Sequence, residues 1–304
     1  MTELWLGPDL NADLLPLVDN LEDWPVARSR CAMLQMFQQQ VGATYENQYD
    51  VGLNYYARLA DHWFFSKLQA HDIKLAFEVP ALKDWSPDGV QAEFAVRSTF
   101  NSVLSAGGRV AAFTLDDPLA ASKSDFPDSP WPLERAVDPV CKVLKVGDDF
   151  GIWQAVGRRG GGITEAYPTC SADDIIAFFG LVQQAGYSPG HLHLDVDEQH
   201  AKQVHSNEKI SADFKQLQHA CKSWGIPFGI ILNGQRGDNP IAYRAGFWEW
   251  FAFARKMLGG DPDRWILESW KKNNLPVNLP ESSQFSHTGL LREVAGTLPF
   301  PRST

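Results

Sequence analysis

Residues 191–234 read HLHLDVDEQHAKQVHSNEKISADFKQLQHACKSWGIPFGIILNG and place a helical pattern between two short strand-like segments. The first segment, 191–197, alternates polar and apolar residues, and the second, 228–232, is almost wholly apolar. Between them, residues 208–224 repeat apolar side chains at the spacing of one helical face. A strand–helix–strand unit of this kind favours a parallel sheet, because the helix carries the chain back to the start of the next strand.

The same alternation extends over the rest of the chain. Strands are expected at 4–6, 32–38, 74–79, 109–115, 162–167, 191–197, 228–232 and 265–268. Helices are expected at 11–29, 51–70, 89–106, 133–146, 172–186, 208–224, 240–258 and 286–295. Eight evenly spaced units predict an α/β fold, a (β/α)8 TIM barrel formed by residues 1–304 as a single domain. An open doubly wound sheet is the competing architecture, but GPDLNA after the first strand lacks the glycine-rich phosphate turn of that fold.

The bulk properties exclude several classes of partner. The 304 residues carry a net charge of −10, which disfavours nucleic acid and anionic membranes because both require a basic face. No apolar run approaches the ~20 residues of a membrane span. The N-terminal MTELWLGPD is not a signal peptide, so we predict a cytoplasmic protein, or a periplasmic or secreted one if a leader has been removed. The four cysteines show no CxxC spacing and are expected to be buried thiols.

Acidic residues recur where the predicted strands end. Active sites of (β/α)8 barrels lie at the carboxyl ends of their strands. Carboxylates close at least five of the eight strands, and these are Glu78, Asp116, Asp117, Glu165, Asp195, Asp197 and Glu268. The seventh strand ends instead in Asn233, and Trp270 follows the eighth. This ring of acids makes an enzyme the leading interpretation.

Alternation along each strand predicts which acids converge. If Phe113, Leu115 and Asp117 face inward, and likewise Ile163, Glu165 and Tyr167, then Asp117, Glu165 and Glu268 meet at the barrel mouth. At least one of three carboxylates buried together should have a raised pKa and act as a general acid, with an ionised partner as nucleophile or base. Asp116 would point away and serve a structural role, and Glu78 fits a structural and a functional role equally well.

The sixth strand has the most specific pattern, since His191, His193, Asp195 and Asp197 alternate on one face. This face indicates a divalent-metal site or a polar layer that supports the catalytic carboxylates. The four residues span about 20 Å, so at most Asp195, Asp197 and His193 could reach one ion. His191, near the strand start, is expected to be structural.

A glycine run invites a different interpretation. Gly160-Gly161-Gly162 follows Arg158-Arg159, which suggests phosphate binding. However, no helix start and no Lys-Ser/Thr pair follows, as a P-loop requires. We therefore expect a flexible loop at this position.

The segment Thr114-Leu115-Asp116-Asp117-Pro118 resembles the end of the fourth strand in the large retaining glycoside-hydrolase clan built on this barrel. That clan has Asn-Glu-Pro there, with the Glu as acid/base, so the resemblance implies Asp117 as acid/base and Asp116 in place of the Asn. The clan has its nucleophile at the end of the seventh strand, where this chain has Asn233; the next acid is Glu268. Trp270 resembles the tryptophans on which such enzymes stack sugars.

These features together predict a glycoside hydrolase or related carbohydrate-active enzyme that acts on an oligosaccharide or polysaccharide without a cofactor. Glu165 or Asp117 would be the general acid/base and Glu268 the nucleophile or second base. The residues expected to bind substrate are Asp195, Asp197, Asn233, Trp270, Glu78 and His193. One alternative is a sugar isomerase or epimerase with a divalent metal among Glu165, Asp195 and Glu268. Another is a non-catalytic carbohydrate-binding barrel.

Overall fold

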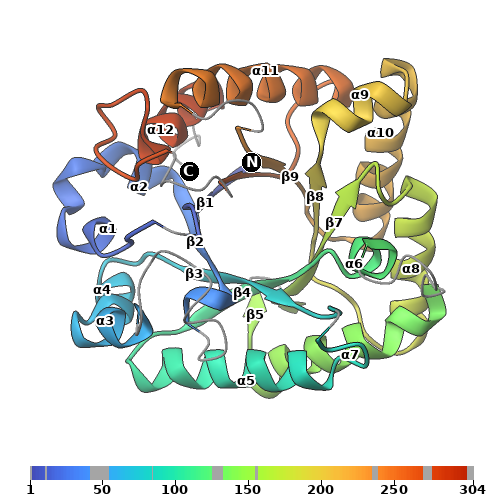
Figure 1. Ribbon diagram of the computed structural model, residues 1–304, viewed down its shortest axis with the longest axis horizontal. Coiled ribbons are helices and arrows are strands. Elements are labelled where there is room, and N and C mark those ends of the chain that lie inside the picture. Colours follow the sequence, from blue (N-terminus) through green and yellow to red (C-terminus); the bar gives the residue numbers. More distant parts are fainter. Residues whose placement is uncertain are drawn as a thin grey trace.

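The eight predicted strands form a closed barrel. A computed structural model describes residues 2–10, 12–41, 55–83, 85–124, 133–154, 157–234, 239–269 and 276–299. The strands are parallel and follow the order β1-β10-β9-β8-β7-β4-β3-β2 around the barrel (Figure 1). Their bounds are β1 Glu3–Gly7, β2 Cys31–Phe37, β3 Leu75–Pro80, β4 Val110–Asp116, β7 Gly161–Tyr167, β8 Leu192–Val196, β9 Phe228–Leu232 and β10 Arg264–Glu268. The predicted (β/α)8 barrel is confirmed.

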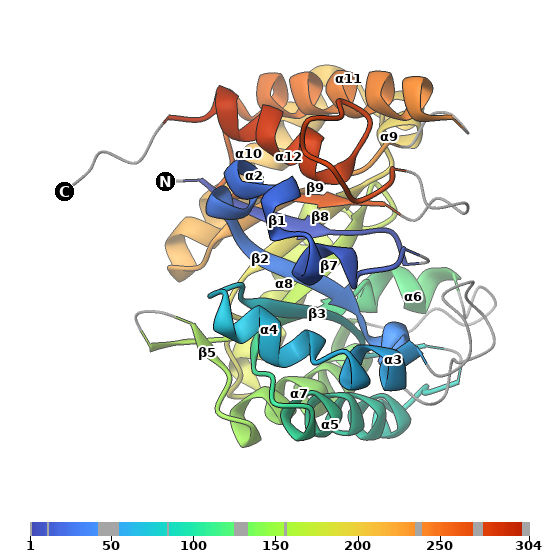
Figure 2. The ribbon, with the colours of Figure 1, turned by 90° about the vertical axis from the view of Figure 1, so that its left-hand side faces the viewer.

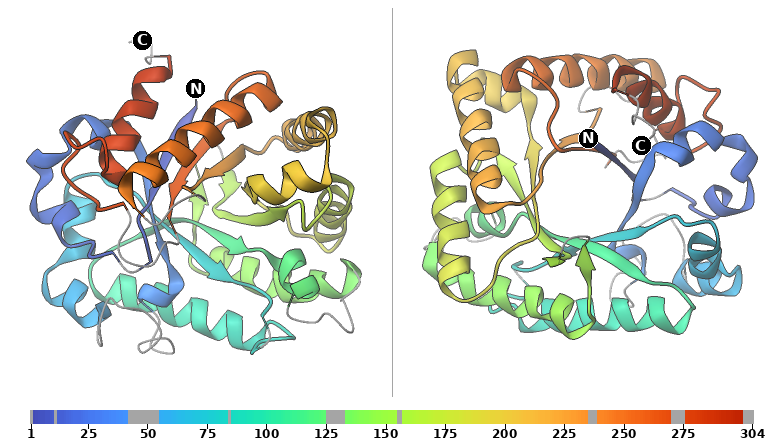
Figure 3. Two further views of the ribbon diagram at one scale, coloured as in Figure 1. Left: turned by 45° about the horizontal axis from the view of Figure 1, so that its top comes forward. Right: turned by 180° about the vertical axis from the view of Figure 1, so that it is seen from behind.

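Helices surround the barrel on all sides (Figures 1 and 3). The longer ones are α5 Val90–Ser105, α7 Leu133–Asp149, α8 Ala172–Gln184, α10 Asn207–Trp224, α11 Pro240–Leu258 and α12 His287–Thr297. The shorter ones are α1 Pro16–Asp19, α2 Pro25–Arg30, α3 Tyr55–Asp61, α4 Phe64–Ala70, α6 Pro118–Ser124 and α9 Glu198–Val204, with 3-10 turns η1 Leu21–Asp23 and η2 Gln38–Gln40. Among the described residues, no helix combines the length and apolar character of a membrane span.

Three local expectations were wrong. The helix expected at 11–29 is broken because Pro16 and Pro25, which cannot continue a helix, begin α1 and α2. The described part of the helix expected at 51–70 is divided at Trp63, whose φ of 58° is left-handed. The expected flexible loop at 160–162 instead joins an antiparallel hairpin, β5 Trp153–Gln154 and β6 Arg158–Arg159, directly to β7.

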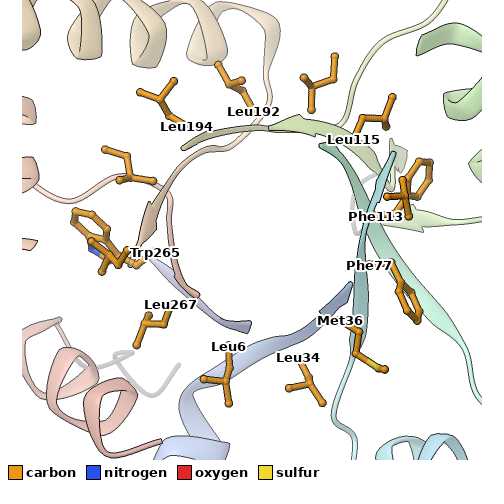
Figure 4. Close-up of a cluster of buried hydrophobic side chains, with 14 of the residues drawn as sticks. Leu6, Leu34, Met36, Phe77, Phe113, Leu115, Leu192, Leu194, Trp265 and Leu267 are labelled. Atoms are coloured by element: carbon orange, nitrogen blue, oxygen red, sulfur yellow. The ribbon is translucent and has the colours of Figure 1, made fainter. Parts of the chain in front are cut away.

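Both faces of the barrel strands are buried. Large apolar side chains point outward against the helices (Figure 4), and those labelled are Leu6, Leu34, Met36, Phe77, Phe113, Leu115, Leu192, Leu194, Trp265 and Leu267. A separate inner cluster contains Trp5, Met33, Ala76, Ala112, Ile231 and Ile266. Burying one large apolar side chain contributes about 1.5–3 kcal/mol, so the outward layer supplies most of the driving force for folding.

Two histidines fill the barrel interior beside Trp5. The His193 ring lies edge-on to Trp5 with centroids 4.9 Å apart, and the His191 and His193 rings are 4.5 Å apart. Burial lowers the pKa of both imidazoles, so they are neutral at physiological pH. Glycines make room for them, because a Cβ on Gly162 would overlap the His191 ring and one on Gly229 would lie 2.8 Å from His193 Cδ2.

The glycine at 162 provides a direct test of this packing. We expect Gly162→Ala to lower the free energy of unfolding by about 1–3 kcal/mol, because the added methyl group overpacks the interior. The matched control is Gly180→Ala in α8, where a Cβ meets nothing within 4 Å. That change should raise the free energy of unfolding by about 0.5–1 kcal/mol, since alanine favours the helix. Urea denaturation of both variants measures the difference, and equal effects would contradict the packing described.

Candidate active site

The inward-facing residues at the carboxyl ends of the strands form a polar ring. Side chains alternate along each strand, so every second residue counted from the inner cluster also faces the barrel axis, up to the strand end. The ring consists of Gln35 on β2, Glu78 on β3, Asp116 on β4, Asp195 on β8, Asn233 after β9 and Glu268 on β10. The Thr114 and Thr164 hydroxyls form a hydrogen bond of 2.9 Å one layer deeper in the barrel. The even-numbered residues of β4 and β7 therefore face inward.

Glu78 and Glu268 are joined through one side chain. The amide nitrogen Nε2 of Gln35 donates to Glu268 Oε1 and also to Glu78 Oε2, at 3.4 Å in the second case. Glu268 is fully buried and Glu78 nearly so. Gly7 makes room for Glu268, since a Cβ there would lie 2.5 Å from Glu268 Cγ. The Tyr243 hydroxyl donates to the Glu268 carbonyl at 3.0 Å, which holds the end of β10 in place.

The two carboxyl groups cannot both be charged at low cost. Burial is the main cause that raises the pKa of Glu78 well above its usual value of 4.5, and the charge of Glu268 adds to it. Burial also raises the pKa of Glu268, with further contributions from Asp195 and Asp116. Glu78 and Glu268 therefore titrate as a coupled pair that retains a proton well above pH 4.5.

Several buried polar atoms of this region have no hydrogen-bond partner among the described residues. They are Gln35 Oε1, Asp117 Oδ1, Glu268 Oε2 and both side-chain polar atoms of Asn233. Asn233 is only 3% exposed. Buried polar atoms in native proteins nearly always have partners, so their concentration here indicates groups poised to bind a polar ligand or water.

Asp116 belongs to this ring, so the expectation that it would point away from the barrel mouth was wrong, and Asp117 follows it in the chain. Asp116 ends β4, and its Oδ2 is 2.7 Å from Lys83 Nζ. Asp117 has a left-handed φ of 44° and accepts the amide of Ala121 as α6 begins. Burial raises the pKa of Asp117, and Asp116 is the next cause. A left-handed backbone and a raised carboxyl pKa at one residue are typical of functional sites.

Glu165 lies outside the barrel, and the expected convergence of Asp117, Glu165 and Glu268 on the inward face is wrong. The inward residues of β7 are Gly162, Thr164 and Ala166, so Glu165 points toward α6. Its Oε1 accepts the backbone N–H of Leu119 at 3.0 Å, and its Oε2 is 3.7 Å from the Cys170 thiol. Burial raises its pKa to about 8 despite these donors. In the structure, Glu165 anchors the first turn of α6.

The acids of β8 separate into two environments. Asp195 is half-buried, and burial followed by the charges of Asp116 and Asp197 raises its pKa to about 7. Asp197 is exposed and caps α9 by accepting the His200 amide at 2.9 Å. His193 lies deeper, against Trp5. Among the described residues, no three His, Cys, Asp or Glu side chains are grouped to hold a metal ion. Trp270 lies outside the described residues.

Analysis of the sequence missed Gln35, Gly7 and Lys83. Gln35 had a visible signal, since it is the one polar residue within the apolar segment AMLQMF at 32–37. Gly7 ends β1, where its lack of a side chain admits Glu268. Lys83 follows a proline-ended strand in a loop, and nothing in its local sequence connects it to Asp116.

Comparisons with known proteins identify the fold alone. No protein-family model and no curated protein matches the sequence. A glucosidase from Croceicoccus marinus aligns with a TM-score of 0.59 and 11% identity over 98% of this chain and 68% of that one. GH5_18 from Streptomyces cattleya in complex with GlcNAc also reaches 0.59, with 11% identity over 99% and 82%. A fungal β-1,4-galactanase reaches 0.52, with 10% identity over 87% and 88%. The chain thus shares its barrel fold with glycoside hydrolases.

The buried pair predicts how stability depends on pH. Because the folded-state pKa of Glu268 exceeds the usual 4.5, the folded protein binds more protons than the unfolded chain above pH 4.5, and stability falls as pH rises. Glu268→Gln keeps an acceptor oxygen for Gln35 but cannot ionise. We expect it to raise the free energy of unfolding by roughly 1 kcal/mol or more at pH 8, and by less at pH 5.

Urea denaturation at the two pH values measures this effect. Glu22→Gln, which removes an exposed carboxylate, is the control and should stay within about 0.5 kcal/mol of the wild-type protein. A Glu268→Gln variant that is less stable than the wild-type protein at pH 8 would show that the carboxylate is not strained by burial.

Proposed function

We propose that this protein is a glycoside hydrolase, or a closely related carbohydrate-active enzyme, whose two reacting carboxyl groups are Glu268 and Glu78. The contact of both with the single amide nitrogen of Gln35 carries this proposal. Cleavage of a glycosidic bond requires one protonated and one ionised carboxyl group on either side of that bond. In a buried pair in which the charge of Glu268 raises the pKa of Glu78, one protonated and one ionised group is the favoured combination once the first proton is lost.

The same contact favours a retaining mechanism. Two oxygens that accept hydrogen bonds from one nitrogen can be no more than about 6 Å apart. Retaining glycosidases separate their carboxyl groups by about 5–5.5 Å, whereas inverting enzymes need about 6.5–9.5 Å to admit a water molecule. We therefore expect a covalent glycosyl-enzyme intermediate.

We assign the nucleophile to Glu268 and the acid/base to Glu78. Glu268 Oε1 is oriented by Gln35, while its Oε2 has no partner among the described residues and can attack the anomeric carbon. The charge on Glu268 raises the pKa of Glu78 and so keeps the proton on Glu78. Glu78 then protonates the leaving oxygen. In the second step it takes a proton from the water that releases the sugar.

Other groups of the ring would bind the sugar hydroxyls. Asn233 offers a donor and an acceptor without partners among the described residues, and Asp195 and the Lys83–Asp116 pair lie on the same ring. Asp117 is a further candidate for binding a sugar hydroxyl, because its buried Oδ1 has no hydrogen-bond partner among the described residues. Asp197, His193 and Trp270 remain predictions from the sequence. The existence of glucosidases and galactanases among barrels of this fold is compatible with the assignment.

The proposal can be tested with 4-nitrophenyl glycosides of the common hexoses and N-acetylhexosamines. We expect release of 4-nitrophenol from at least one of them, and we expect Glu268→Gln and Glu78→Gln each to reduce kcat by about 100-fold or more. Glu165→Gln is the matched control, because that carboxylate is equally buried but points toward α6. It should retain most of the wild-type kcat, provided that the protein stays folded.

Further measurements separate the alternatives. With Glu268→Ala, azide should restore turnover by attacking the anomeric carbon in place of the missing carboxylate. This is a single displacement, so the product should be a glycosyl azide of inverted configuration. Loss of wild-type activity with EDTA, restored by a divalent metal, would instead favour the isomerase or epimerase. Sugar binding with no turnover by the wild-type protein would favour a non-catalytic carbohydrate-binding barrel.

A further inference from the structure

A cavity lies at the opposite end of the barrel from the Glu78–Glu268 pair, where the strands begin. Its volume is about 780 Å³, within the range of small-molecule sites. It lies among the starts of β1, β9 and β10, the second half of α10 and β6 of the small hairpin. Figure 2 shows the N-terminus and β5 at one end of the barrel and α6 at the other. The right-hand view of Figure 3 looks at the end with the N-terminus.

The cavity is basic although the chain is acidic. Its ionisable lining residues are Arg158, Lys215, His219, Lys222, Arg264, Glu3 and Asp263. Four of them carry permanent positive charge and two carry negative charge, in a chain of net charge −10. Both carboxylates are already engaged, because Glu3 Oε2 is 2.8 Å from Arg264 Nε and Asp263 Oδ2 accepts the Phe228 amide at 3.0 Å. Counting both carboxylates, the lining still has two more permanent positive charges than negative ones.

One face of α10 carries three of the basic side chains. Lys215, His219 and Lys222 are spaced i, i+4 and i+7, so they lie along the same side of the helix. No carboxylate forms an ion pair with Lys215 or Lys222 among the described residues. Lys222 lies in the last turn, where a cation complements the carbonyl end of the helix. Lys215 lies mid-helix and has no such structural explanation.

Arg158 reaches this cavity from the hairpin. It has no ion pair within the described ranges, yet it lies close enough to Arg264 for its charge to contribute, after burial, to lowering the pKa of that guanidinium. Gly160 lets the end of β6 lie close to the residue before β5, because a Cβ there would lie 2.9 Å from the carbonyl oxygen of Ile152. Both guanidinium groups line the same cavity, and Glu3 already pairs with Arg264, so Arg158 is the guanidinium without an ion-pair partner among the described residues.

We propose that this cavity binds a phosphate-bearing small molecule, with the phosphoryl group held by Arg158 and Lys215 and approached by Arg264. A guanidinium group can donate two parallel hydrogen bonds to two phosphate oxygens, and an ammonium group adds a positive charge. The remaining volume can take an organic substituent. The motif Arg158-Arg159-Gly160-Gly161-Gly162 would then contribute to phosphate binding through the Arg158 side chain, without the helix start that a P-loop uses.

The test measures binding of inorganic phosphate and glucose 6-phosphate by calorimetry, at constant ionic strength maintained with sodium chloride. Unphosphorylated glucose is the control ligand. We expect saturable binding of both phosphates at this site, and Arg158→Gln and Lys215→Gln should each weaken it by at least about tenfold, the loss of one charge-assisted hydrogen bond. Lys142→Gln on α7 removes the same charge outside the cavity and should bind as the wild-type protein does.

Each outcome is decisive. Tighter binding of glucose 6-phosphate than of phosphate would support contact with the organic part, and equal affinity would support a site for the phosphoryl group alone. Absence of saturable phosphate binding by the wild-type protein would overturn the proposal. Wild-type affinity in both Arg158→Gln and Lys215→Gln would do the same. Lys215 is exposed, so its replacement should leave the fold intact, and circular dichroism of each variant checks this.

Discussion

Each strand of this barrel must bury both of its faces, one against the helices and one against the barrel axis. The space around the axis is limited, and on β3, β4 and β7 the small residues Ala76, Ala112 and Gly162 face inward while Phe77, Phe113 and Ile163 face outward. Because side chains alternate strictly, this choice in the middle of a strand also decides which residue points into the mouth at its end. The position of every candidate catalytic group depends on that constraint.

The interior changes in character along the barrel axis. Arg264 and Arg158 lie where the strands begin, neutral His191 and His193 pack against Trp5 in the middle, and carboxyl groups gather where the strands end. The imidazoles are held neutral by burial and the positive charges near them, while the carboxyl groups have raised pKa values because of burial and one another. Opposite charges are thus kept at opposite ends, and each end can attract a different ligand.

Burial raises the pKa values of Glu78 and Glu268, and it also makes their ionisation destabilising for the folded protein. The two carboxyl groups share one hydrogen-bond donor, Gln35, and Glu268 keeps one oxygen without a partner among the described residues. Such an arrangement destabilises the folded protein at high pH, and it favours the loss of one proton from the pair before the other. Glu165 is equally buried but holds two backbone amides of α6, so its carboxylate contributes to structure. Burial and a raised pKa therefore do not identify a catalytic residue unless its side chain also points into the barrel mouth.

The sequence by itself determined the eight strands, the barrel and the acids at the strand ends, because hydrophobic periodicity and chain order are local properties. It could not decide which face of β4 and β7 is inward, since both faces of a parallel strand are buried and apolar there. The prediction therefore placed Glu165 in the mouth, where the fold places Thr164 and Ala166, and it assigned Glu78 to substrate binding. The size difference between Ala112 and Phe113 was the available signal. Only the closed barrel brings Gln35, Glu78 and Glu268 together, because strands distant in sequence become neighbours when β1 pairs with both β2 and β10.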